Sequence, residues 1–239
     1  MKTSKVFDID ISKLDLLESA NLVNKWLSQD KKRQVVTANS EMLYLAYKDK
    51  EFKYILQNAD MVTPDGVGSV WAAKTLDTAV KERVAGYDLL RKILEVSRAK
   101  VFLLGAKDEV VSSAAKKIRK MYQGIDVVGY KDGYFEDDEL VIKEINSLEP
   151  DIIFVALGCP RQEIWISKNL EKLNVKVAMG VGGSFDVIAG IVKRAPRIWQ
   201  KLGIEWLYRL IKQPSRFTRM LALPKFVCIV LKMKVLNKD

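Results

Sequence analysis

The stretch IIFVALGCPRQEIWISKNLEKLNVKVAMGVGGSFD, residues 152–186, decides the fold class. It opens with an apolar run at 152–157, continues with helical spacing at 161–173, and returns to an apolar run at 177–181. Apolar strands that alternate with helices are typical of a largely parallel sheet with helices on both faces. We therefore expect a Rossmann-like α/β fold, whose ligands bind at the carboxyl ends of the strands.

The same alternation extends toward the N-terminus. Further strands are expected at 6–11, 34–37, 61–63, 101–104 and 125–128, and helices at 14–27, 39–57, 66–76, 87–97, 109–122 and 137–148. From Ile191 onward the pattern becomes amphipathic helix, which Pro196, Pro214 and Pro224 are expected to break. The sequence thus predicts an α/β domain at 1–190 and a basic helical C-terminal appendage at 191–239.

The last fifth of the chain carries the net charge. The 239 residues include 40 Lys+Arg and 30 Asp+Glu, a formal net charge of +10. Residues 190–239 hold 12 of the basic residues and two of the acidic ones, which leaves 28 of each sign in residues 1–189. A neutral body with a basic tail indicates that the tail meets something anionic, either a membrane surface or a nucleic acid.

The composition narrows the chemistry. A hydrophobic content of 49% excludes a disordered chain, and no apolar stretch is long enough to span a membrane. The first 13 residues lack the apolar core of a secretion signal, so we expect a cytoplasmic protein. The chain contains no histidine, which removes the most frequent general base and every histidine metal site. Proton transfer must then fall to Asp, Glu, Lys, Tyr or Cys.

Four strand ends carry residues that suit a ligand. They are Thr37–Asn39, Thr63–Gly68, Gly158–Glu163 and Gly180–Asp186. Three of them are glycine-rich turns that lead toward helix N-termini, where exposed amides favour phosphate. None is a Walker loop or a full G-x-G-x-x-G after the first strand. The glycines therefore predict either a phosphorylated ligand or simply tight turns.

Five motifs in order resemble one known family. They are Thr-Pro-Asp-Gly at 63–66, Gly-x-Pro-x-Gln-Glu at 158–163, Gly-Val-Gly-Gly-Ser-Phe-Asp at 180–186, Lys-Arg-Ala-Pro at 193–196 and Glu-Trp-Leu-Tyr-Arg-Leu at 205–210. From about Thr37 to Arg219 the chain resembles the WecG/TagA/CpsF glycosyltransferases, glycosyltransferase family 26. The resemblance implies transfer of a sugar from a UDP donor to a lipid-linked acceptor, with inversion at the sugar carbon and without a metal or other cofactor.

Within the family, the resemblance points to one donor and one acceptor. It implies transfer of N-acetylmannosamine from UDP-N-acetylmannosamine to the 4-hydroxyl of N-acetylglucosaminyl-diphospho-undecaprenol, which makes the linkage disaccharide lipid of wall teichoic acid. A family member that transfers another sugar, such as N-acetylmannosaminuronic acid or glucose, stays open. So does a nucleic-acid-binding protein with a basic arm, although no RRM, KH or helix-turn-helix pattern is present. The oligomeric state is left open.

Asp65 and Arg83 are the expected catalytic residues. Asp65 follows a strand end between Pro64 and Gly66, and the resemblance implies that its carboxylate is the base that deprotonates the acceptor. The residue type alone would equally suit a helix N-cap. Arg83 would neutralise the donor diphosphate, for which a guanidinium is suited. The alternative is a surface ion pair with Glu82 or Asp88.

The expected substrate-binding residues come from the other strand ends and from the tail. They are Thr37, Asn39, Gln162, Gly158, Gly182, Gly183, Asp186, Arg209, Arg216 and Arg219. Thr37, Asn39 and Gln162 would hydrogen-bond sugar hydroxyls or the acetamido group, and Gly182, Gly183 and Asp186 would line the nucleotide site. Helix capping by Asn39, Ser40 or Asp186 and a solvated Gln162 are the alternatives. The tail arginines would converge on the diphosphates.

Two further features concern a metal and the membrane. Asp8-Ile9-Asp10 has the Asp-x-Asp form of a metal motif, but it lies at the start of the first strand, so we expect a solvated strand face there. Trp199, Trp206, Tyr208 and Phe217, together with the apolar run 226–236, would dock the protein on the inner face of the cell membrane as a peripheral protein. The alternative is that these aromatic side chains pack on the body.

Overall fold

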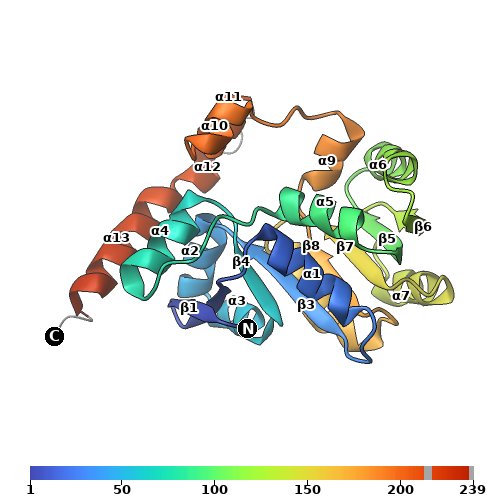
Figure 1. Ribbon diagram of the computed structural model, residues 1–239, viewed down its shortest axis with the longest axis horizontal. Helices are drawn as coiled ribbons and strands as arrows, with labels where there is room; N and C mark the ends of the chain where they lie inside the picture. The colour runs from blue at the N-terminus through green and yellow to red at the C-terminus, as the bar shows by residue number, and fades with distance from the viewer. Residues whose placement is uncertain (213–216, 237–239) are drawn as a thin grey trace.

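The computed structural model describes residues 1–212 and 217–236, and it is built on an eight-stranded sheet (Figure 1). The strands are β1 Thr3–Val6, β2 Ile9–Ser12, β3 Arg33–Ala38, β4 Met61–Pro64, β5 Ala99–Gly105, β6 Ile125–Lys131, β7 Ile152–Ala156 and β8 Val177–Gly180. Their order is β1-β2-β4-β3-β8-β7-β5-β6, and every neighbouring pair is parallel except β1 with β2. The predicted Rossmann-like, largely parallel sheet is confirmed.

Alternate side chains of each central strand enter different cores. Val35 of β3 and Met179 of β8 pack on one face of the sheet, whereas their neighbours Val36 and Ala178 pack on the other. This period of two is the geometry of a strand, and burial on both faces explains why β8 and the middle of β3 are apolar.

Helices cover both faces (Figure 1). The residues of α1 Leu16–Trp26, α5 Gly86–Val96, α6 Asp108–Met121 and α9 Ser184–Ala189 share one core. On the other face, α2 Ser40–Lys48, α3 Lys50–Asn58 and α4 Val67–Leu76 pack near β1 and β2, and α7 Asp138–Ser147 and α8 Arg161–Asn169 pack over β5, β7 and β8. A short 3₁₀ helix, η1 Leu170–Lys172, follows α8.

The chain leaves the two middle strands in different directions. After β3 it enters α2, which packs toward the β1 end of the sheet. After β8 it enters α9, which packs on α6 toward the β6 end. Such a divergence opens a crevice at the carboxyl ends of neighbouring strands, and this is where open α/β sheets bind ligands.

The C-terminal segment, defined here as residues 191–212 and 217–236, is helical and belongs partly to the core. It contains α10 Arg197–Lys201, α11 Glu205–Lys212, α12 Phe217–Met220 and α13 Ala222–Leu236. Helix α13 lies along α2 and α4, where Phe226 is 1% exposed and its ring stands 5.7 Å from that of Phe7. The predicted helical character is confirmed, and α13 buries apolar surface of the body.

Two expected elements are divided in the structure. The strand expected at 6–11 is a hairpin, because Phe7 and Asp8 have φ of 54° and 63° and turn the chain between β1 and β2. The helix expected at 39–57 is broken at Asp49, whose extended backbone ends α2 and whose carboxylate accepts from Glu51 and Phe52 at the start of α3. A local cap therefore outweighs continuous helical spacing here.

The expectation that Pro224 breaks a helix is wrong. Pro224 is the third residue of α13. Amides in the first turn of a helix have no intrahelical partner, so proline costs no hydrogen bond there. Pro196, by contrast, directly precedes α10, as its role as a helix boundary predicts.

Candidate active site

Asp65 lies at the carboxyl end of β4 and is tied to two other elements. Its backbone nitrogen donates to Ala38 O at 3.0 Å, which joins it to the end of β3. Its side-chain oxygen Oδ2 accepts from the backbone nitrogen of Gly86, the first residue of α5, at 3.2 Å. The positive end of the α5 dipole therefore faces the carboxylate and favours its ionised form.

The alternative that Asp65 caps the next helix is not what the structure shows. The N-cap of α4 is Gly66, at φ 108°, and no side chain caps this helix. The carboxylate of Asp65 reaches α5 instead, which starts 21 residues later. The carboxylate of Asp65 is thus held at the sheet edge by a helix that follows much later in the chain.

Thr37 and Asn39 lie beside Asp65, at the end of β3. Thr37 is buried, and a Cβ placed on Gly86 would lie only 2.7 Å from Thr37 Oγ1, so a glycine is needed for α5 to approach this closely. Asn39 is exposed, and its Oδ1 accepts from the backbone nitrogen of Met42 at 2.9 Å. The capping alternative for Asn39 is confirmed, and contacts of either side chain with a sugar stay predictions.

Gln162 joins two glycine-rich loops. Its Oε1 accepts from the backbone nitrogens of Gly158, at 3.2 Å, and Gly182, at 3.0 Å, so it links the loops that follow β7 and β8. Its Nε2 donates to Glu163 Oε1 at 2.6 Å. Gln162 is only 4% exposed, so the alternative of a solvated side chain is wrong. Recognition of an acetamido group by Gln162 stays a prediction.

Glu163 is a residue of this site that the sequence analysis missed. It is 1% exposed, and its Oε2 has no hydrogen-bond partner. Burial raises its pKa to about 7, although hydrogen bonds from Gln162 and Cys159 favour the charged form. A glutamate in the first turn of a helix is ordinarily solvated, so only its place in the Gly-x-Pro-x-Gln-Glu motif could have marked it.

Three glycines leave open space around the strand ends. Gly66, Gly158 and Gly182 all have positive φ, and a Cβ added to any of them would meet no atom within 4 Å. They follow β4, β7 and β8. Exposed backbone at three strand ends leaves room for a ligand to approach the main chain.

Gly183 and Asp186 begin α9 next to this space. Gly183 is the N-cap, and Asp186 is the third residue of the helix and not its cap, so the capping alternative for Asp186 is wrong. A Cβ on Gly183 would lie 3.6 Å from Asp186 Oδ2, which places this carboxylate beside the loop. Lining of a nucleotide site by these residues stays a prediction.

Arg83 pairs with the C-terminal segment. Its Nη1 lies 3.3 Å from Glu205 Oε2 of α11, so its partner is neither Glu82 nor Asp88. Asp88 instead receives both terminal nitrogens of Arg194, at 2.5 and 2.7 Å. Burial lowers the pKa of Arg194, but the hydrogen bonds that it donates to Asp88 and the negative charge of that carboxylate outweigh burial and raise the pKa above its usual value.

The structure describes the helices that carry two of the three expected tail arginines. Arg209 lies in α11 and Arg219 in α12, in line with a helical tail. Arg216 lies outside the described residues. Convergence of these three side chains on a diphosphate stays a prediction.

The Asp8-x-Asp10 pair has other partners. Asp8 Oδ2 lies 2.7 Å from Lys53 Nζ, and Asp10 Oδ1 accepts from Thr3 Oγ1 at 3.2 Å. Within residues 1–212 and 217–236, no three His, Cys, Asp or Glu side chains form a group suited to a metal. Within the same ranges, no helix is long and apolar enough to cross a membrane.

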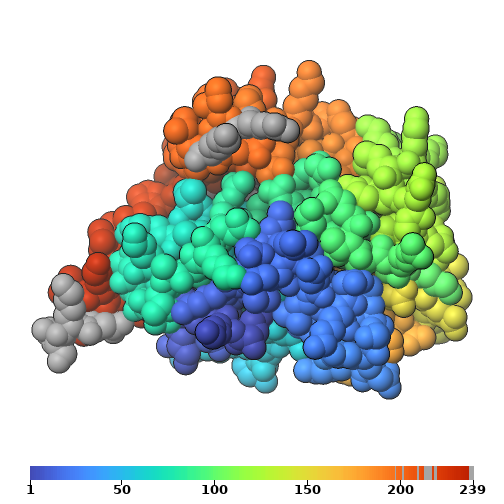
Figure 2. Space-filling view, viewed as in Figure 1, coloured from blue at the N-terminus to red at the C-terminus, as the bar shows by residue number. Residues whose placement is uncertain are grey.

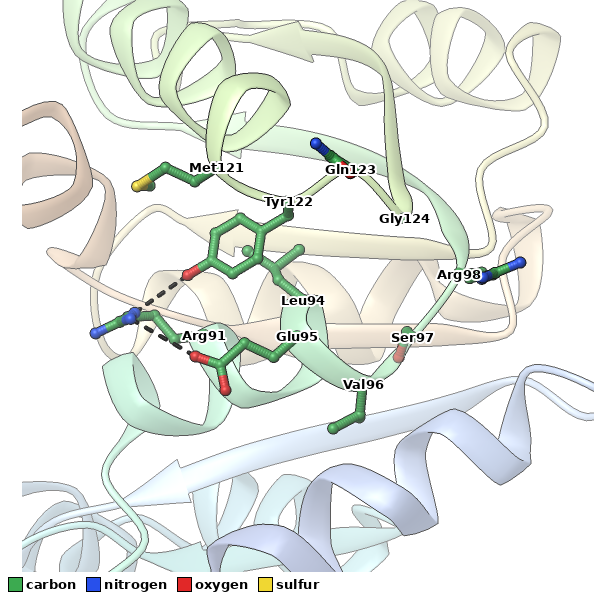
Figure 3. Close-up of a pocket in the computed structure, with 10 residues that line it drawn as sticks. All are labelled: Arg91, Leu94, Glu95, Val96, Ser97, Arg98, Met121, Tyr122, Gln123 and Gly124. Atoms are coloured by element: carbon green, nitrogen blue, oxygen red, sulfur yellow. Dashed lines mark hydrogen bonds and ion pairs between the residues drawn. The ribbon is translucent and has the colours of Figure 1, made fainter.

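A surface depression of about 620 Å³ lies away from these residues, at the amino ends of β5 and β6 (Figure 3). Arg91 lines it and donates to Tyr122 Oη at 3.1 Å, as the dashed line in Figure 3 shows. The C-terminal ends of α5 and α6 also border the depression. Because helix C-termini carry partial negative charge, this place suits a phosphate less well than the carboxyl edge does.

Comparison with known proteins agrees with the geometry of the carboxyl edge. Residues 4–239 match the model of the glycosyl transferase WecG/TagA/CpsF family. An N-acetylglucosaminyldiphosphoundecaprenol N-acetyl-beta-D-mannosaminyltransferase of Bacillus spizizenii is 38% identical, over 93% of this chain and 90% of its own. Proteins of the same name from Bacillus subtilis and Staphylococcus aureus are also 38% identical, over 97% and 84% of this chain and 92% and 80% of theirs. The chain therefore belongs to the WecG/TagA/CpsF family of glycosyltransferases.

Proposed function

We propose that this protein transfers N-acetylmannosamine from UDP-N-acetylmannosamine to the 4-hydroxyl of N-acetylglucosaminyl-diphospho-undecaprenol. The product is the linkage disaccharide lipid of wall teichoic acid. One observation carries the proposal: a carboxylate, Asp65, is held by the N-terminus of α5 at the carboxyl edge of the sheet, the same edge that carries three glycines with open space around them. The names of the relatives that are 38% identical supply the sugar and the acceptor.

The base of the reaction is Asp65. The donor sugar is α-linked to UDP and the product is β-linked, so a single displacement suffices. The acceptor oxygen attacks the sugar carbon C1, its proton passes to a carboxylate oxygen of Asp65, and UDP leaves with the electron pair of the C1–O bond. A positioned base contributes roughly 10²- to 10⁴-fold. The amide of Gly86 keeps the carboxylate oriented and ionised.

The leaving diphosphate gains negative charge during the displacement. Arg83 stands near the carboxyl edge, in the segment whose Val84 nitrogen donates to Pro64 O at 2.9 Å. The backbone amides around Gly158 and Gly182 and the N-terminus of α9 add fixed positive dipoles. These groups neutralise the diphosphate without a metal ion, with further arginines supplied by the tail.

The C-terminal segment brings the protein to its lipid acceptor. On α13 the exposed face carries Val227, Leu231 and Val235 at a spacing of four, while Phe226 and Val230 face the core. Lys225, Lys232 and Lys234 are exposed on the same helix, which runs along one side of the molecule (Figure 2). An apolar stripe flanked by lysines suits an anionic membrane surface, which supports docking on the inner face of the membrane.

The expected interfacial aromatics divide into two kinds. Trp206 and Phe217 are exposed, as docking requires. Trp199 and Tyr208 pack edge-to-face on each other, with ring centroids 5.6 Å apart. The docking surface proposed here is therefore the stripe on α13 together with Trp206 and Phe217.

The test is direct. Purified protein is incubated with lipid-linked N-acetylglucosamine diphosphate and a panel of UDP-sugars, and the products are identified by mass spectrometry. We expect addition of one N-acetylhexosamine from UDP-N-acetylmannosamine and from no other donor at a comparable rate. Preference for UDP-glucose or for the uronic acid donor would keep the family but overturn the proposed sugar.

A further inference from the structure

We infer that Arg194 is a positioning residue, which holds the C-terminal segment over Asp65 through its ion pair with Asp88. The kinetic part of this inference rests on the proposed function, whereas the docking part does not. Arg194 is the fourth residue of the segment, and Asp88 is the third residue of α5, the helix whose first amide holds Asp65. One turn of helix would thus orient the base and anchor the segment.

The ion pair between Arg194 and Asp88 fixes both the distance and the relative orientation of the two side chains. Both terminal nitrogens of Arg194 bond the two oxygens of Asp88, at 2.5 and 2.7 Å. The guanidinium also lies over the ring of Tyr87, 4.9 Å from its centroid. A bidentate pair stacked on a ring restricts rotation as well as distance, which a single ion pair between flexible side chains does not.

Further contacts join the same segment to Arg83 and to Val67. Glu205 Oε2 lies 3.3 Å from Arg83 Nη1, and Glu205 Oε1 lies 3.9 Å from Arg194 Nε. Gly203, at φ 72°, packs so tightly on Val67 that a Cβ there would clash with Val67 Cγ1. Val67 starts α4, two residues after Asp65, and Asp88 follows Gly86 by two. Residues 194–205 therefore contact both α4 and α5, the helix that follows Asp65 and the helix whose first amide holds it.

This arrangement makes Arg194 more than a surface charge. The Arg194 side chain is 19% exposed, and its Nε is buried without a hydrogen bond. Loss of Asp88 would leave a half-buried guanidinium with the longer ion pair to Glu205 in place of two direct hydrogen bonds, and loss of Arg194 would remove both of these hydrogen bonds from the carboxylate of Asp88. Either loss should release residues 196–212 from the base while the sheet stays folded.

A double-mutant cycle tests the inference. Arg194→Gln, Asp88→Asn and the double variant are compared with the full-length protein, with circular dichroism confirming the fold. Backbone hydrogen exchange is measured by mass spectrometry in peptides that cover 197–212. We expect each single change to raise exchange there at least about tenfold, and the double variant to match the worse single change. Exchange in peptides that cover β3, β4 and β8 should stay unchanged.

Kinetics supply the second readout. Each variant should lower kcat roughly 30- to 100-fold, while the Kd for UDP, measured by calorimetry, changes less than about threefold. Arg194→Lys keeps the charge but not the bidentate geometry, so it should recover only part of kcat. The control is Lys92→Ala, which removes an exposed ion pair with Glu95 on the same helix and should change kcat less than twofold.

Two results would overturn the inference. One is unchanged exchange at 197–212 in both single variants, and the other is losses of kcat that add in the double variant. If the wild-type protein transfers no sugar to the lipid acceptor, the proposed function fails. The exchange cycle would still decide whether Arg194 and Asp88 dock the segment.

Discussion

The carboxyl edge of the sheet, which carries Asp65, and residues 194–205 of the C-terminal segment, which contact α4 and α5, are held by different kinds of contact. At the edge, main-chain amides fix the side chains, since Gly86 N holds Asp65 while Gly158 N and Gly182 N hold Gln162. In the segment, charged side chains make the contacts, through Arg194 with Asp88 and Glu205 with Arg83. Amide contacts follow from the fold itself, whereas ion pairs depend on charge and salt. This difference indicates that the fold alone positions the base, Asp65. Residues 194–205, which we call the cover, dock separately through their own ion pairs.

The largest expected effect is on the edge. Asp65→Asn preserves size and can still accept a hydrogen bond from Gly86 N, but it cannot take a proton. We expect kcat to fall roughly 100- to 10,000-fold, with UDP affinity and thermal stability little changed. Steady-state kinetics and a thermal melt check this. Near-normal turnover would show that Asp65 is not the base. The carboxyl edge would then no longer differ from residues 194–205 by carrying the base.

The next prediction concerns α13, where the C-terminal segment is held by apolar packing instead of charge. Phe226→Ala removes a ring that is 1% exposed and leaves a cavity beside Phe7. We expect the free energy of unfolding to fall by about 3–5 kcal/mol in chemical denaturation. Leu231→Ala, on the exposed face of the same helix, is the control and should change it by less than about 0.5 kcal/mol. Equal effects of the two would mean that α13 does not pack as the structure shows.

This packing changes what a truncation would mean. The sequence predicts that residues 1–190 fold alone, because all the expected strands lie before that point. The structure adds that Phe226 and Val230 complete the core near β1, β2 and α2. Deleting the segment from Ile191 would therefore expose apolar surface as well as remove arginines. Point changes test the function of the segment more cleanly than deletion.

How far the sequence could predict the site depended on how local each contact is. Pro64 and Gly66 mark the strand end at Asp65 on their own, but only the family resemblance favours a base over a helix cap there. The hydrogen bond from Gly86 N to Asp65 joins residues that are 21 positions apart in the sequence. The ion pair of Arg194 with Asp88 joins residues that are 106 positions apart, so no local pattern marks either contact. Gln162 was placed in the site, but its role as a clamp requires the loops after β7 and β8 to be neighbours. Likewise, residues 226–236 are apolar except for Lys232 and Lys234, so the sequence does not show that Phe226 and Val230 are the side chains that pack on the body.

The next prediction concerns the pH dependence of stability, which Glu163 at the carboxyl edge should influence. Its pKa is raised from 4.5 to about 7 by burial, so between these values the folded protein binds more protons than the unfolded one. The contribution of Glu163 to stability is fully present below pH 4.5 and is lost as the pH rises through 7. The shift corresponds to about 3 kcal/mol. The Glu163→Gln variant cannot titrate at this position, so its unfolding free energy should lack this part of the slope.

The quantity to measure is the difference in unfolding free energy between the wild type and the Glu163→Gln variant. Urea denaturation of wild type and Glu163→Gln at half-unit steps from pH 4.5 to 8 should show the variant gaining stability relative to wild type as the pH rises. Glu139→Gln, which removes an exposed ion pair with Lys172, serves as the control and should show little change in the difference over this range. A constant difference for Glu163→Gln would mean that Glu163 keeps an ordinary pKa in the folded protein.

A smaller effect is expected on membrane binding, which tests whether the outer face of the C-terminal segment has a role of its own. Replacing Val227, Leu231 and Val235 by serine removes the exposed stripe without touching the buried face of α13. Binding to vesicles that contain phosphatidylglycerol should fall about tenfold. Turnover on a short-chain soluble acceptor should be unchanged. Leu140→Ser, an exposed leucine on α7, is the matched control, and an equal loss in that variant would mean that vesicle binding is not specific to α13.

The smallest expected effect is that of metal chelation. It tests whether backbone amides and arginines suffice to neutralise the donor diphosphate at the carboxyl edge. A catalytic metal would need several oxygen ligands, and Asp65 already accepts a hydrogen bond from Gly86 N. Asp8 and Asp10, the pair in metal-motif form, are engaged by Lys53 and Thr3. Activity in EDTA should therefore stay within about twofold of that in Mg²⁺, and Asp10→Asn should behave like wild type in both conditions. Loss of turnover in EDTA that Mg²⁺ or Mn²⁺ restores would show that a cation takes part in neutralising the diphosphate. In that case the arginines of the segment could not be its sole counter-charges, and the cover would be less important to the chemistry than its contacts with the base imply.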